Sequence, residues 1–112
     1  MNIAELEYAI PRSLRYPFIA IAEIIHPESG GISGSQVAKI SLNGCYVDTA
    51  KTLPLGSEVV IKIFAESGCF AATAEVVYAN SNSGVGLAFR EVPPKSAALL
   101  RQWLLKASAA AK

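Results

Sequence analysis

The chain has 112 residues, of which 52% are hydrophobic and 17% charged, so it is long enough to bury one apolar core. Ten Lys and Arg residues against nine Asp and Glu residues leave a formal net charge of +1. This near-neutral balance argues against a protein that coats nucleic acid, and the hydrophobic content argues against a disordered chain. The composition therefore predicts one compact domain whose function is carried by a few residues.

The N-terminal stretch 1–7 is acidic where a secretion signal is basic, and no apolar segment follows it. No run approaches the roughly 20 apolar residues of a membrane-spanning helix. Cys45 and Cys69 both have apolar neighbours, and two cysteines do not make a disulfide framework. We therefore expect a cytoplasmic protein without membrane insertion, whose two thiols are reduced, packed and inert.

The first 17 residues differ from the rest, because Pro11 and Pro17 exclude a continuous helix there. We expect 1–17 to be a leader or loop, followed by a single domain over 18–112. From residue 18 the pattern becomes typical of β-structure, with turn signals roughly every ten residues. The expected strands lie at 18–25, 36–42, 45–47, 58–64, 70–78 and 85–90. Such a series predicts a mainly β fold, a closed or nearly closed six-stranded antiparallel barrel.

The segment 36–42 alternates, which predicts that Val37, Lys39 and Ser41 share one face of their strand. The following Asn43-Gly44 is a strong hairpin signal, although a β-bulge would also use it. The segment 58–64 alternates in the same way, which predicts that Val59, Ile61 and Ile63 share one face of their strand.

The C-terminal segment changes from a β period to a helical one after Pro93-Pro94. Ser96 is predicted to cap a C-terminal α-helix. One apolar stripe at helical spacing is formed by Leu99, Leu100, Trp103, Leu104 and Ala107. This stripe would pack either on the barrel or on a partner protein.

Catalytic residues are scarce. His26 is the only histidine, and no Gly-x-Ser-x-Gly nucleophile pattern accompanies it. One His and two distant Cys fall short of a zinc set. The glycine-rich 30–34 segment precedes a strand and no helix, so it does not fit a phosphate-binding loop. We therefore expect no enzyme, no cofactor and no metal.

Two local features are suited to binding. Arg12 and Arg15 stand on the proline-stiffened leader, and guanidinium groups pair with phosphate oxygens or the acceptor edge of guanine. Lys39, Ser41 and Gly44 lie at a strand end, where a glycine permits a close approach to the backbone. Taken alone, each feature is equally consistent with solvated arginines or an ordinary strand-to-turn junction.

Together and in this order, the two features resemble the PilZ domain family. Its signature is an Arg-x-x-x-Arg leader followed by Asp/Asn-x-Ser-x-x-Gly. Arg15 resembles the second arginine, 40–47 the Ser–Gly half of the second motif, 84–89 the last strand and 97–104 the terminal helix. The resemblance runs from residue 11 to residue 105. It implies a six-stranded barrel with a C-terminal helix that binds the bacterial second messenger cyclic di-GMP.

The signature has two departures. Pro11 holds the position of the first arginine, with Arg12 one place later, and Lys39 holds the position of the Asp or Asn. In the family that Asp or Asn accepts from the donor edge of guanine. An ammonium group has three donors and no acceptor, so Lys39 is instead suited to a phosphate.

The resemblance implies a non-catalytic signalling module that binds cyclic di-GMP through Arg12, Arg15, Lys39, Ser41 and Gly44, and passes the signal to an unknown protein effector. The alternative is a divergent PilZ-type adaptor that reads no nucleotide and acts through protein contacts. A barrel for single-stranded nucleic acid would need a basic groove with stacking aromatics, which the net charge of +1 disfavours.

Overall fold

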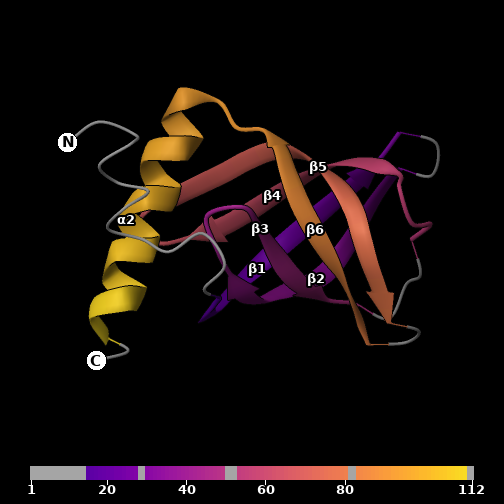
Figure 1. Ribbon diagram of the computed structural model, residues 1–112. Coiled ribbons are helices and arrows are strands. Elements are labelled where there is room, and N and C mark those ends of the chain that lie inside the picture. Colours follow the sequence, from indigo (N-terminus) through magenta and orange to yellow (C-terminus); the bar gives the residue numbers. More distant parts are fainter. Residues whose placement is uncertain (1–14, 28–29, 50–52, 81–82, 111–112) are drawn as a thin grey trace.

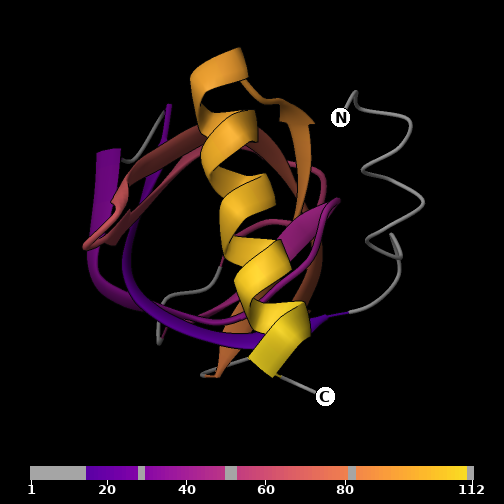
Figure 2. The ribbon, with the colours of Figure 1, turned by 90° about the vertical axis from the view of Figure 1, so that its left-hand side faces the viewer.

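Over the described residues, six strands close into an antiparallel barrel, and the C-terminal helix lies across one of its open ends (Figures 1 and 2). The computed structural model describes residues 15–27, 30–49, 53–80 and 83–110. The elements are β1 (Tyr16–His26), β2 (Gly30–Ile40), β3 (Gly44–Asp48), β4 (Glu58–Ala65), β5 (Gly68–Asn80), β6 (Gly84–Glu91) and α2 (Pro94–Ala110). The expected fold class is confirmed.

The strands are hydrogen-bonded in the order β1-β2-β3-β6-β5-β4, and β4 pairs with β1 to close the barrel. Neighbours along the chain form hairpins, apart from β3 and β4. Consequently β3 pairs with β6, the last strand, which places residues 44–48 directly beside residues 84–88. All ladders are antiparallel, as expected for short strands joined by turns.

Every strand except β4 begins earlier than predicted, by one to six residues. Tyr16 and Pro17, assigned to the leader, already belong to β1, where Pro17 stands next to an irregularity of register. The glycine-rich 30–34 segment is part of β2, although this strand was predicted to begin only at residue 36. Pairing with the far end of β1 extends β2, which overrides the low β propensity of glycine.

The predicted alternation over 36–42 is wrong at one point. Val37 pairs with Val47 and Lys39 pairs with Tyr46, so β2 has one residue more than β3 between the two pairs. This irregularity turns Val37 into the core and Lys39 out to solvent, although they are two residues apart. Lys39 therefore lies on the outer surface of the barrel.

The barrel interior is filled by branched and aromatic side chains. The in-phase residues of β4, namely Val59, Ile61 and Ile63, are all buried, as their alternation predicts. The largest fully buried side chain is Phe70 of β5, which lies against the partly buried Phe89 with ring centroids 5.0 Å apart. This packed interior leaves only the outer surface and the ends of the barrel for binding.

The helix begins at Pro94, two residues before the predicted cap. Proline suits this first helical position because its missing N–H has no partner there in any case. Ser96 lies inside the first turn, and its Oγ accepts a hydrogen bond from the backbone N–H of Ala71 at 3.0 Å. Ser96 thereby ties the helix to β5.

The apolar stripe of the helix faces the barrel. Leu100, Trp103 and Leu104 are buried, and the ring of Trp103 lies 4.9 Å from that of Phe18, centroid to centroid. The indole Nε1 of Trp103 donates to Ser67 Oγ at 2.6 Å. Of the two expected roles for the stripe, packing on the barrel is therefore the one observed.

The two cysteines differ in burial, and the prediction that both thiols are packed is wrong for Cys69. Cys45 is buried, and burial raises the pKa of its thiol from 9.0 to about 12. Cys69 is exposed, because Phe70 beside it faces the core and successive strand residues point to opposite sides.

Within the described residues, no helix is both long and apolar enough to cross a membrane.

Candidate functional site

The hairpin turn between β2 and β3 is fixed by the residues of the expected Ser-x-x-Gly motif. The backbone N–H of Ser41 donates to the Gly44 carbonyl at 2.8 Å. The Ser41 hydroxyl also donates to that carbonyl at 3.1 Å, and it accepts from the Gly44 N–H at 3.2 Å. Phe89 of β6 donates its N–H to the Asn43 carbonyl at 2.8 Å, which anchors the turn to the neighbouring strand.

Gly44 is required by the close approach of β6. A Cβ at this position would collide with the backbone carbonyl oxygen of Leu87, so any larger residue would push β3 away from β6. The close approach expected at Gly44 is therefore made by the protein's own backbone. Ser41 and Gly44 shape the turn, and a contact of either with a ligand stays a prediction.

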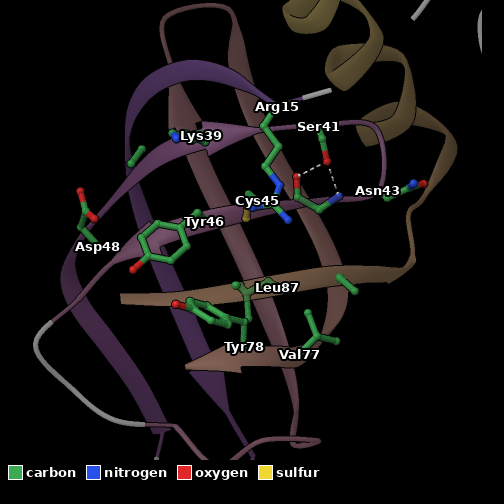
Figure 3. A pocket seen from close by; sticks show the side chains of 14 residues that line it. Arg15, Lys39, Ser41, Asn43, Cys45, Tyr46, Asp48, Val77, Tyr78 and Leu87 are labelled. Atoms are coloured by element: carbon green, nitrogen blue, oxygen red, sulfur yellow. Dashed lines mark hydrogen bonds between the residues drawn. The ribbon is translucent and has the colours of Figure 1, made fainter. Parts of the chain in front are cut away.

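The principal pocket lies on the outer surface beside this turn, with a volume of about 840 Å³ (Figure 3). Four of the five predicted site residues line it: Arg15, Lys39, Ser41 and Gly44. Its floor is formed by β3 and β6, with β2 on one side and β5 on the other. The volume lies within the roughly 300–1,000 Å³ of small-molecule sites. The fifth predicted residue, Arg12, lies outside the described residues.

The pocket has a cationic side. Arg15 stands immediately before β1, and Figure 3 shows its side chain directed across the turn toward β3. Lys39 follows from β2, and both residues are exposed. Over the described part of the chain, the ion pair that forms is Arg90 with Glu75, outside the pocket. Arg15 and Lys39, which have no carboxylate partner among the described residues, are available there to an anionic ligand.

The pocket also contains residues that the sequence analysis did not select. Tyr46 and Asp48 of β3, Tyr78 of β5 and Asn43 of the turn all line it. The alternation of β3 would have placed Tyr46 and Asp48 on the same face as Gly44. No sequence signal would have brought in Tyr78, because its proximity depends on β6 pairing with both β3 and β5.

A family model for the PilZ domain matches residues 11–106, and the chain therefore belongs to the PilZ domain family. Family membership supports a signalling module, and no catalytic family is indicated. Among curated protein sequences, none matches this chain significantly.

Solved structures share the fold. The Bacillus subtilis inhibitor of motility MotI (DgrA) superposes with a TM-score of 0.72 at 18% identity, over 87% of this chain and 50% of that one. The present chain thus spans half the length of MotI. The PilZ domain of Escherichia coli YcgR, solved with cyclic di-GMP, gives 0.70 at 15% identity, over 88% of this chain and 91% of that one.

A third similar structure is the PilZ domain of CeSA from a cellulose-synthesising bacterium. It gives a TM-score of 0.66 at 14% identity, covering 84% of this chain and 97% of that one. At these identities the likeness concerns the fold alone.

Proposed function

We propose that this domain binds cyclic di-GMP in the pocket beside the β2–β3 turn and passes the signal to a protein effector. The observation that carries the proposal is the convergence of Arg15, Lys39, Ser41 and Gly44 on one pocket. These residues come from two segments of the chain, Arg15 before β1 and the continuous stretch 39–44. The YcgR domain of the same fold was solved with this nucleotide, which supports the choice of ligand.

The phosphates are assigned to the two cations. The planar fork of Arg15 suits two phosphate oxygens, and the ammonium of Lys39 acts as a second point charge. Each charge-assisted hydrogen bond contributes about 1.5–3 kcal/mol. Loss of one such contact corresponds to a roughly ten- to hundredfold weaker affinity.

Isothermal titration of the purified chain with cyclic di-GMP tests the proposal. A stoichiometric complex is expected, and Arg15→Ala should weaken it roughly ten- to hundredfold. Arg101→Ala is the matched control, because it removes the same charge from α2, away from the pocket. Absence of heat from the wild-type chain at tens of micromolar nucleotide would refute cyclic di-GMP binding.

Lys39 separates this function from the alternative. If Lys39 binds a phosphate, Lys39→Ala weakens the complex about tenfold and Lys39→Asp weakens it further. Lys62→Ala on β4, outside the pocket, should leave the affinity unchanged. A large gain in affinity from Lys39→Asp would instead mean that lysine at this position disables an otherwise intact site.

The alternative function, an adaptor that reads no nucleotide, is favoured by a different observation. Three large apolar side chains on the outer surface of β1 and β4 are exposed: Ile19 by 77%, Ile21 by 67% and Phe64 by 43%. Ile21 and Phe64 pair directly across the two strands. If the chain is such an adaptor, the wild-type chain captures an effector that the Ile21→Asp variant does not capture. Titration of the wild-type chain with cyclic di-GMP then gives no heat.

A further inference from the structure

A row of residues crosses the outer face of the barrel at the pocket. Tyr46 of β3 pairs with Gly86 of β6, and Gly86 pairs in turn with Tyr78 of β5. On the other side of Tyr46, the pairing partner is Lys39 of β2. Two aromatic rings therefore flank a position that has no side chain, with a cation at one end of the row.

The glycines of β6 let both rings lie against the sheet. A Cβ at Gly86 would lie 3.1 Å from the Cβ of Tyr78. A Cβ at Gly84 would lie 2.8 Å from the Tyr46 ring carbon Cε1 and 2.7 Å from its hydroxyl oxygen. The ring centroids are 6.3 Å apart with an interplanar angle of 47°, and Tyr78 is 51% exposed. The result is an accessible aromatic surface inside the pocket.

Asp48 lies at the end of this surface. It is the next outward-facing residue of β3 after Tyr46, roughly 7 Å further along the strand, and it pairs with Gly84. Its side chain is exposed and lines the pocket (Figure 3). Within the described residues it makes no ion pair, so its carboxylate oxygens are available as acceptors.

We propose that Tyr46, Tyr78 and Asp48 form a base-binding subsite, in which a guanine stacks on the tyrosines and donates its N1–H and N2–H to the Asp48 carboxylate. The inference rests on the proposed binding of cyclic di-GMP. Aromatic rings stack any base, so the tyrosines supply affinity without selectivity. A carboxylate only accepts, and guanine offers two adjacent donors where adenine has an acceptor at N1.

This subsite explains how the pocket operates with a lysine at position 39. Lys39 has donors only and cannot read the donor edge of guanine. Asp48 provides the missing acceptor on the neighbouring strand, two residues beyond the partner of Lys39. The phosphates then lie toward Arg15 and Lys39, and the base lies toward Asp48.

The test is isothermal titration of the full chain with cyclic di-GMP and, separately, with cyclic di-AMP. Tyr78→Ala should weaken both complexes roughly tenfold, whereas Tyr78→Phe, which keeps the ring, should bind within about twofold of the wild type. Asp48→Asn should reduce the preference for the guanine over the adenine dinucleotide roughly tenfold. Leu55→Ala, which truncates an exposed large apolar side chain outside the pocket, is the control.

The outcomes separate the two proposals. If the wild type binds cyclic di-GMP and both Tyr78→Ala and Asp48→Asn behave like it, the subsite is refuted and the proposed function stands. If the wild type gives no heat with either dinucleotide, the proposed function fails and the subsite fails with it. An unchanged circular dichroism spectrum for each variant shows that the measured loss is a loss of binding.

Discussion

The helix-covered end of the barrel and the pocket face are built from opposite kinds of residue. Beneath α2, Trp103 and Leu104 are buried, and the polar atoms of Trp103 and Ser96 have hydrogen-bond partners in the protein. In the pocket, Arg15 and Lys39 make no ion pair with a described residue, and Tyr78 is half exposed. The first region is complete without a ligand, and the second is open to one.

This contrast predicts that the two regions respond differently to substitution. Changes beneath the helix should alter the free energy of unfolding, and changes at the exposed pocket residues should alter affinity alone. The turn at Ser41–Gly44 combines the two behaviours, although it lies in the pocket. It lines the pocket, and its hydrogen bonds also hold β2, β3 and β6 together, so its substitution should alter stability as well. The following changes test the contrast.

Trp103→Ala should have the largest effect. Trp103 is only 4% exposed, its ring packs against that of Phe18, and its indole N–H donates to Ser67. Its truncation should lower the free energy of unfolding by about 3–5 kcal/mol. Urea unfolding measures this loss. It is followed by circular dichroism and not by tryptophan fluorescence, because the variant lacks the only tryptophan. Leu105→Ala, at an exposed position of the same helix, should change stability little.

Gly44→Ala should come next, with a loss of about 2–3 kcal/mol from overpacking between β3 and β6. The added Cβ has no room, because the carbonyl of Leu87 occupies its position. Tyr78→Ala removes far more side chain from the same face and should cost below about 1 kcal/mol. Equal losses in urea unfolding would contradict the distinction between turn residues and exposed pocket residues.

The fold was readable from the sequence because periodicity reports burial. The alternation of Val59, Ile61 and Ile63 and the helical spacing of Leu100, Trp103 and Leu104 both correspond to buried faces. Strand ends were less readable, since the extension of β2 through its glycines depends on pairing with β1. The irregularity beside Lys39 depends on β3 in the same way.

The site was readable only where it follows the motif. Arg15, Lys39, Ser41 and Gly44 were selected from local sequence and do line one pocket. Tyr78 lies 32 positions after Tyr46 in the printed sequence, and only the strand order β3-β6-β5 brings them together. A single sequence contains no signal for such pairing. The same applies to Ser96, whose partner on β5 was not evident from its place near the start of the helix.

Ser96→Ala should have an intermediate effect. It removes the acceptor for the Ala71 N–H, and an unpaired buried donor costs about 1–3 kcal/mol. We expect the lower half of that range, because the bond is only partly buried. Ser108→Ala, near the end of the same helix, is the control and should not destabilise the protein. Both are measured by urea unfolding, and equal stabilities of the two variants would contradict a tie between α2 and β5.

Cys45 predicts a smaller effect that depends on pH. Its pKa is raised by burial to about 12, so the folded thiol stays protonated while the unfolded thiol ionises above 9.0. The resulting stability is fully present below pH 9 and declines as the pH rises toward 12. The stability difference between the wild type and Cys45→Ala should shrink by about 1 kcal/mol between pH 8 and pH 10. A constant difference would contradict a buried, neutral thiol.

Arg90→Ala should lower stability only slightly and leave nucleotide binding unchanged. Arg90 donates from Nε and Nη2 to Glu75 Oε1, at 3.1 and 2.7 Å, on the surface outside the pocket. An exposed ion pair of this kind contributes about 0–1 kcal/mol. Arg15 is the same residue type and makes no ion pair with a described residue, so Arg15→Ala should leave the free energy of unfolding unchanged and weaken the binding of cyclic di-GMP. Urea unfolding and nucleotide titration of both variants give a direct comparison. If Arg90→Ala lowered the affinity for the nucleotide as much as Arg15→Ala does, binding would depend on the general surface charge and not on the pocket.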